Sequence, residues 1–212
     1  MKRVLDPDEV NALLKTFTRA PTSIRNRALI VVLWRAGLRI SEALALLPAD
    51  LDRKRERIQV REGKGGKARV VAMGSLSWDA LDEWMRVRRK LGIGSTKPVF
   101  ATLDGGTIKG AYVRAMLKRK ARRAGIDPEL VHPHAFRHAF AVDLHRRNVP
   151  LDHIRRLLGH ASLAGTTHYL ERIDPEEALD SARSLDGDGD TSEVALLRRE
   201  VAALAARLEV VA

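Results

Sequence analysis

Apolar residues recur at helical spacing along most of this chain, and the first such stretch opens with a recognisable start signal. Asp6 can cap a helix, Pro7 suits its first turn, and Glu9 completes a capping-box pattern. One face of the helix then collects four apolar side chains, namely Val10, Leu13, Leu14 and Phe17. The pattern predicts an amphipathic helix at the start of the chain.

A second helix, predicted over residues 23–36, is apolar enough to lie in the core, and Gly37 should end it in the left-handed conformation. Ser41 is expected to cap a short helix that ends at Pro48. Helical periodicity then returns over five stretches: 77–91, 107–124, 133–147, 151–158 and 174–185.

One segment between these helices changes to the two-residue period of a β-strand. Ile58 and Val60 alternate with polar residues, and Val70 and Val71 follow a glycine-rich turn at 63–66. This pattern predicts a β-hairpin. The expected fold class is α+β: a mainly helical domain with one small antiparallel sheet.

The composition shifts near the C-terminus. Residues 1–185 carry the domain pattern, 186–190 form an acidic, glycine-rich linker, and 191–212 predict an amphipathic helix. Its apolar positions alternate in spacings of three and four over about two and a half heptads: Val194, Leu197, Val201, Leu204, Leu208 and Val211. Such a helix either docks on its own domain or joins two copies as a coiled coil.

Charge points to a polyanionic partner. The chain has 38 Lys and Arg against 27 Asp and Glu, a formal net charge of +11, which favours nucleic acid over a merely basic domain. Cysteine is absent, which excludes disulfides, thiolate zinc sites and a cysteine nucleophile, and fits a reducing cytoplasm. Apolar runs are too short to span a membrane.

Positive charge is concentrated between residues 109 and 123, where no acidic residue occurs. On a helix, Arg114, Lys118 and Arg122 would share one face, and Lys109 would precede it. A solvated helix face is the alternative, but such faces usually mix charges of both signs. We therefore expect this helix to contact DNA phosphates.

Candidate catalytic side chains follow one another in the last part of the domain. His134, Arg137, His160 and Tyr169 lie within a short span, and Arg39 precedes them far upstream. Lys64, in the glycine-rich turn, adds an ammonium group. Because the set has a phenol and several cations but no metal cage, it favours phosphoryl transfer onto tyrosine over metal-assisted hydrolysis.

Together these motifs resemble those of the tyrosine recombinases, the phage-integrase family. The resemblance runs from about residue 5 to residue 180 and keeps the family order. It rests on five pieces of sequence: Ala-Gly-Leu-Arg39-Ile-Ser-Glu, Gly-Lys64-Gly, Pro-His134-Ala-Phe-Arg137-His-Ala-Phe-Ala, Leu-Leu-Gly-His160 and Thr-Thr-His-Tyr169.

The resemblance implies site-specific DNA strand exchange on specific double-stranded sites. Tyr169 would attack a scissile phosphate to form a 3′-phosphotyrosyl link and free a 5′-hydroxyl. His134 would accept the tyrosine proton, and Arg39 and Arg137 would clamp the phosphate oxygens. His160 would hydrogen-bond the phosphate.

Lys64 would protonate the leaving 5′-oxygen, with Lys67 as a rival for that role or as a DNA contact. No metal or nucleotide cofactor is expected, because the phosphotyrosyl link retains the energy of the phosphodiester.

Taken singly, these residues have simpler interpretations. Arg39 could form a helix-start ion pair with Glu42, and Tyr169 could be a half-buried aromatic side chain. His134 and His138 have the spacing of a zinc pair, but the glutamate of the metalloprotease motif is missing. Tyr112, the other tyrosine, is expected to pack or to contact phosphate. The combination of residues, in family order, carries the hypothesis.

Most family members have a helical DNA-clasping domain before the catalytic one, and here the catalytic pattern begins almost at Met1. We therefore expect a catalytic domain alone, with weaker and more salt-sensitive DNA binding. A synaptic homo-oligomer, a tetramer on DNA, is implied by the resemblance. Two alternatives remain: a catalytically silent DNA-binding regulator on the same fold, and a topoisomerase IB-like strand-swivelling enzyme.

Overall fold

The computed structural model describes residues 3–61 and 68–159, all within one compact unit of the chain. Its helices are α1 (Pro7–Lys15), α2 (Pro21–Arg35), α3 (Ile40–Ala45), the 3₁₀ turn η1 (Pro48–Asp50), α4 (Ser75–Lys90), α5 (Gly110–Arg123), α6 (Pro133–Arg146) and α7 (Leu151–Leu158). Three short strands form one antiparallel sheet: β1 (Leu51–Asp52), β2 (Arg57–Val60) and β3 (Arg69–Ala72). The predicted fold class is confirmed.

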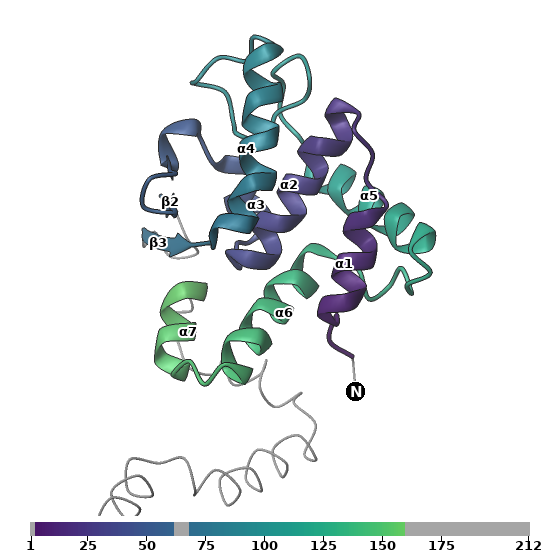
Figure 1. The fold of residues 1–212 in the computed structure, drawn as a ribbon, viewed down its shortest axis with the longest axis vertical. Helices are drawn as coiled ribbons and strands as arrows, with labels where there is room; N and C mark the ends of the chain where they lie inside the picture. The colour runs from purple at the N-terminus through teal and green to yellow at the C-terminus, as the bar shows by residue number, and fades with distance from the viewer. Residues whose placement is uncertain (1–2, 62–67, 160–212) are drawn as a thin grey trace, which may run out of the picture. The chain divides into compact units, whose positions relative to one another are not determined.

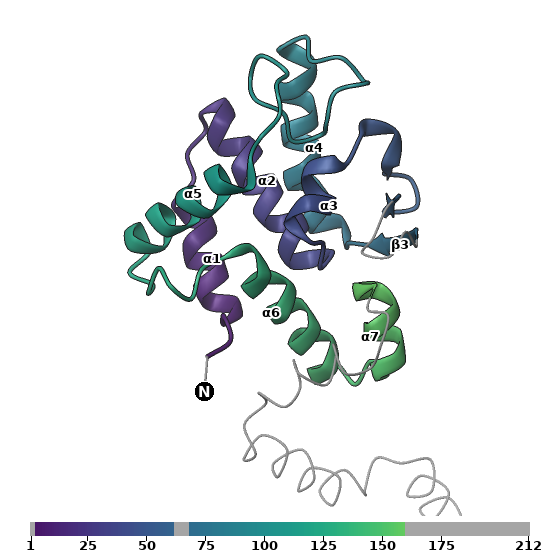
Figure 2. The same ribbon diagram turned by 180° about the vertical axis from the view of Figure 1, so that it is seen from behind.

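Helix α2 runs through the middle of the described fold. Residues 28–34 are all buried, and α2 packs against both α4 and α6 (Figures 1 and 2). On α4, the indole N–H of Trp84 donates to the Val99 carbonyl at 2.8 Å, which ties the following loop to the core. A helix segment buried on nearly all sides needs a continuous apolar run, which α2 has at residues 28–34.

The N-terminal start signals are confirmed. The Asp6 side chain accepts from the Asp8 backbone N–H at 2.7 Å, and Glu9 accepts from the Asp6 backbone N–H at 3.0 Å. Gly37 follows the second helix with φ +62°, the left-handed conformation that the sequence predicts.

The prediction that Ser41 caps the next helix is wrong. Arg39 is the cap residue of α3, because the Glu42 carboxylate accepts the Arg39 backbone N–H at 2.8 Å and so places the helix start two residues earlier. The helix ends at Ala45, and Pro48 begins η1 instead.

The predicted β-hairpin is present as β2 and β3, paired antiparallel with Ile58 opposite Val71. Ile58, Val60 and Val71 are buried, whereas Val70 is 48% exposed, as strand alternation requires. The added strand β1 pairs with β2 and was not predicted. Its two residues are too few to show a period.

Helices α6 and α7 form the lower part of Figure 1, and α7 contacts both α6 and β3. The predicted helices at 133–147 and 151–158 match these two closely. The predicted helix at 174–185, the linker at 186–190 and the heptad helix at 191–212 lie outside the described residues. No helix among those described is long and apolar enough to cross a membrane.

Candidate active site

Three arginines from three different elements surround one buried carboxylate. Glu42 on α3 is 6% exposed, and Arg39 donates to it through its backbone N–H and through Nη1, both at 2.8 Å. Arg69 on β3 donates to both carboxylate oxygens, at 2.9 and 2.8 Å. Nη1 of Arg137 on α6 lies 3.9 Å from Oε2. These four residues are called the Glu42 cluster below.

The cluster holds Glu42 in its charged form. Burial raises the pKa of this carboxyl, but hydrogen bonds from Arg69 and then Arg39 outweigh it and lower the pKa from 4.5 to about 2. One ionised carboxylate therefore faces three guanidinium groups, and the cluster carries two positive charges in excess. Such an excess suits the binding of a phosphodiester.

The same three arginines also hold the C-terminal end of α7. Three successive carbonyls each accept from a different arginine: Leu157 from Arg69 Nε at 2.7 Å, Leu158 from Arg137 Nη2, and Gly159 from Arg39 Nη2 at 3.3 Å. The carbonyl end of a helix carries partial negative charge, so cations stabilise it. His160, the next residue, lies outside the described residues.

Glycines at two turns allow these close approaches. The Gly37 carbonyl accepts from Arg137 Nη1 at 2.7 Å, and a Cβ at Gly37 would lie 2.3 Å from a Phe140 ring carbon. Gly159 ends α7 with φ +65°, and a Cβ there would lie 3.0 Å from Nη1 of Arg69. Both turns bring backbone against side chains that a larger residue would displace.

The first turn of α6 carries the proposed general base. His134 is exposed, and the rings of His132 and His134 stack with centroids 6.5 Å apart. His132 caps the helix, accepting from the Ala135 backbone N–H at 3.2 Å. Since His134 and Arg137 are three residues apart on one helix, they are neighbours along its surface.

His138, the other member of the hypothetical zinc pair, is 6% exposed, unlike His134. Within residues 3–61 and 68–159, no three or more His, Cys, Asp or Glu residues gather in a way that could hold a metal ion.

Lys64, Lys67, His160 and Tyr169 lie outside the described residues, so their roles stay predictions. Residues 62–67, which include both lysines, lie in the sequence between β2 and β3.

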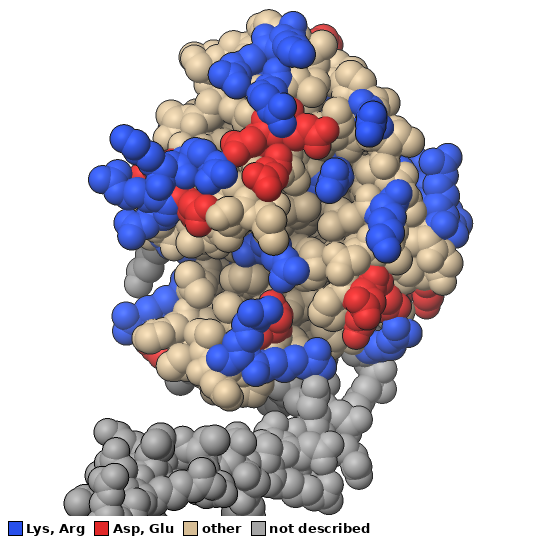
Figure 3. All heavy atoms as spheres, in the orientation of Figure 1, with Lys and Arg blue, Asp and Glu red and all other residues tan. Residues whose placement is uncertain are grey.

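The predicted DNA-binding residues lie along α5. Lys109 is its cap residue, and Lys109, Arg114 and Arg122 are exposed. Lys118 instead forms an ion pair with Glu129, with 2.6 Å between Lys118 Nζ and Glu129 Oε1. Figure 3 shows Lys and Arg side chains spread over one face, with Asp and Glu in a few groups among them.

Tyr112 on α5 has a packing role that the sequence allowed. Its hydroxyl oxygen accepts from Arg25 at 3.1 Å and from Asn26 at 3.0 Å, and Arg25 also lies over its ring. Arg25 and Asn26 are both buried on α2, so the hydroxyl helps to satisfy two buried donors.

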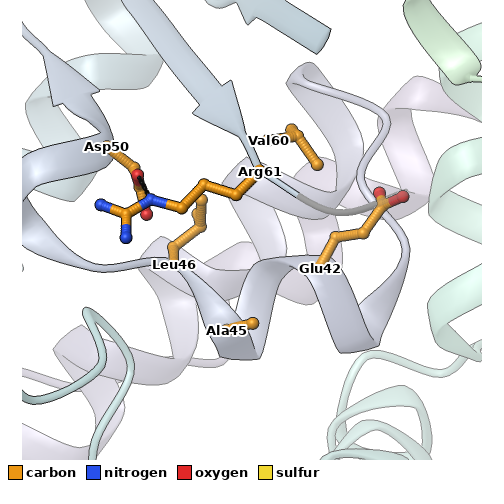
Figure 4. A pocket seen from close by; sticks show the side chains of 6 residues that line it. All are labelled: Glu42, Ala45, Leu46, Asp50, Val60 and Arg61. Carbon is orange, nitrogen blue, oxygen red and sulfur yellow. Dashed lines mark hydrogen bonds and ion pairs between the residues drawn. The ribbon is translucent and has the colours of Figure 1, made fainter. Parts of the chain in front are cut away.

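A pocket of about 200 Å³ is lined by Glu42, Ala45, Leu46, Asp50, Val60 and Arg61. Figure 4 shows Asp50 and the Arg61 guanidinium together in this pocket, with the Glu42 side chain at a distance from them. Neither Arg39 nor Arg137 lines it, so the pocket is not the phosphate site of the Glu42 cluster.

Sequence reasoning missed two members of the cluster. The sequence indicates Glu42 only as an ion-pair partner of Arg39, and that contact exists. Its position three residues after Arg39 was the available signal. Arg69 had no signal, because strand alternation shows which side chains point inward but not which distant group they meet.

Comparison with known proteins agrees with this architecture. The sequence pattern of the "Phage integrase family" matches residues 3–175. A tyrosine recombinase XerC from Xanthomonas axonopodis pv. citri (strain 306) is 39% identical over 169 residues, which cover 80% of this chain and 54% of the relative. XerC from Xylella fastidiosa (strain M23) is 37% identical, covering 80% and 56%. The chain thus spans about half the length of the curated relatives it matches.

Two solved structures share the fold. The crystal structure of XerA recombinase has a TM-score of 0.75 and 26% identity, covering 87% of this chain and 63% of its own. XerH site-specific recombinase, in a post-cleavage complex with palindromic difH substrate, has a TM-score of 0.73 and 28% identity, covering 84% and 51%. With the family pattern matched over most of its length, this chain belongs to the phage integrase family.

Proposed function

We propose that this protein is a site-specific DNA recombinase that cuts and rejoins DNA through a 3′-phosphotyrosyl intermediate. The observation that carries the proposal is the Glu42 cluster: Arg39 and Arg137, far apart in sequence, converge on one carboxylate and leave an excess of positive charge. Membership of the phage integrase family and the recombinase names of its relatives support the same reaction.

In the proposed reaction, the Tyr169 oxygen attacks the scissile phosphorus and the bond from phosphorus to the 5′-oxygen breaks. The phenol has an ordinary pKa of about 10, so its proton must pass to a base, and His134 is the candidate. Lys64 supplies a proton to the 5′-oxygen. Rejoining reverses both transfers, which conserves the phosphodiester energy without a nucleotide cofactor.

The arginines stabilise the negative charge that builds on the phosphate oxygens. Arg39 is 25% exposed and can reach a ligand. Arg137 is 1% exposed and stabilises the arrangement of the Glu42 cluster from its buried side. Guanidinium groups already fixed by Glu42 and the α7 carbonyls lose little freedom on binding phosphate. The His160 imidazole would add a further hydrogen bond from the residue after Gly159.

DNA is the proposed partner, bound at specific sites. Lys109, Arg114 and Arg122 on α5 would contact its phosphates. A synaptic tetramer in the nucleoid, with self-association through residues 191–212, is part of the proposal. Sedimentation of the full chain and of a chain that ends at residue 190 would test the last point. If the full chain and the shortened chain are both monomers at tens of micromolar, self-association through residues 191–212 is refuted.

A suicide DNA substrate, nicked beside the scissile phosphate, tests the reaction. The intact chain should form a covalent protein–DNA adduct, and Tyr169→Phe should form none. DNA binding without any adduct would favour a silent regulator instead. Relaxation of plasmids that lack any specific site would favour the topoisomerase-like alternative.

A further inference from the structure

Arg69 makes three hydrogen bonds that join three separate parts of the fold. It is the first residue of β3, and its side chain is 9% exposed. Nε donates to the Leu157 carbonyl at 2.7 Å, and the two terminal nitrogens donate to the two oxygens of Glu42. One side chain therefore connects β3, α3 and the end of α7.

These contacts give Arg69 a different role from that of Arg39. Each of its three nitrogens donates to the protein, and its guanidinium is nearly enclosed. Arg39 is more exposed, at 25%, and donates to Glu42 through only one guanidinium nitrogen. Arg69 therefore acts on the site through other residues rather than by touching DNA.

The net charge of the Glu42 cluster indicates how Arg69 acts on the site. A two-point arginine–carboxylate pair is the strongest common ion-pair geometry, so Arg69 is the main partner of Glu42. With Arg69 present, the Glu42 cluster has three positive charges and one negative charge. Without Arg69, Glu42 would draw its counter-charge from Arg39 and Arg137, and the excess would fall from two to one.

We propose that Arg69 is a positioning residue that neutralises Glu42 internally, so that the exposed Arg39 is available to bind the substrate phosphate and the charge of the buried Arg137 adds to the positive potential there. Its third hydrogen bond, to Leu157, fixes the end of α7 in the same step. This inference rests on the proposed DNA-cleavage function.

Single-turnover cleavage of the nicked DNA substrate tests it with charge-changing variants of the full chain. Arg69→Met should lower the adduct-forming rate constant about 30-fold, equivalent to about 2 kcal/mol, while the DNA dissociation constant changes less than about threefold. Arg69→Lys keeps the charge and should stay within about fivefold of wild type.

The double variant Glu42→Gln with Arg69→Met separates charge from structure. It removes one charge of each sign and restores the excess of two positive charges. We expect it to cleave at least about tenfold faster than Arg69→Met alone, a coupling that loss of packing would not produce. Circular dichroism should first show that each variant is folded.

Arg61→Met is the matched control. Arg61 directly follows β2 and also pairs with a buried carboxylate, that of Asp50, but none of its hydrogen bonds or ion pairs within the described residues is to the Glu42 cluster. Its cleavage rate should stay within about threefold of wild type.

The outcomes separate this inference from the proposed function. If wild type forms no adduct, the proposed function fails and this inference with it. If wild type cleaves and Arg69→Met cleaves equally fast, only the role of Arg69 is refuted. Failure of the double variant to recover would also refute it, because Arg69 would then act only as packing.

Discussion

The protonation of Glu42 should govern part of the stability of the fold. Its carboxyl is 6% exposed, and its pKa falls from 4.5 to about 2 because hydrogen bonds from Arg69 and Arg39 outweigh the effect of burial. Such a difference corresponds to about 3 kcal/mol of folding free energy. Because the folded pKa is the lower one, this stabilisation is present above about pH 4.5 and is lost as pH falls towards 2.

Glu42→Gln removes the charge but keeps the shape and an acceptor for the Arg39 backbone N–H. The variant should therefore be less stable than wild type by about 3 kcal/mol at pH 7, in line with the loss of a buried ion-pair partner. The gap should shrink as pH falls from 5 to 2, because protonated Glu42 then resembles glutamine.

Urea unfolding followed by tryptophan fluorescence measures this gap at each pH. Trp34, Trp78 and Trp84 are buried, so unfolding exposes all three indoles. Other carboxylates titrate in both proteins and cancel in the difference. A gap that stays constant from pH 7 to pH 2.5 would refute the linkage between Glu42 ionisation and stability.

Three further predictions concern other parts of the fold. Gly37→Ala should lower the unfolding free energy by about 3 kcal/mol in urea titrations, since φ is +62° and the new Cβ would lie 2.3 Å from a Phe140 ring carbon; no loss would contradict the turn geometry. Arg88→Met should cost about 3 kcal/mol by the same assay, because the buried guanidinium donates to four carbonyls of the loop after α4, and a cost below about 1 kcal/mol would contradict this. Arg114→Ala should weaken DNA binding and reduce the slope of log affinity against log salt by about one, whereas Lys118→Ala should do so less because its ammonium is already ion-paired; equal slopes would contradict the difference.

Local signals carried most of the fold prediction. The Asp6 capping box, the left-handed glycine after α2 and the apolar run of α2 each depend on residues close in sequence. These features can therefore be recognised without knowing which distant residues they contact. Ser41 shows the limit, because serine is a favoured cap residue, yet the Glu42 carboxylate accepts the Arg39 backbone N–H and Arg39 caps the helix.

The features that could not be predicted depend on contacts between residues that are distant in sequence. Arg69 meets Glu42 and Leu157 only because β3 lies beside α3 and α7, and no spacing along the chain encodes that arrangement. The pairing of Lys118 with Glu129 likewise needs the turn after α5. The motif residues Arg39 and Arg137 lie at one carboxylate, and their predicted role as a phosphate clamp stays a prediction.

The most direct test of the account is the identity of the residue that becomes linked to DNA. The adduct formed on a nicked substrate would be digested with protease and nuclease, and the nucleotide-bearing peptide sequenced by mass spectrometry. The chain has two tyrosines, so the alternatives are few. The account predicts a 3′-nucleotide on Tyr169, and a nucleotide on Tyr112 or on any other side chain would contradict it.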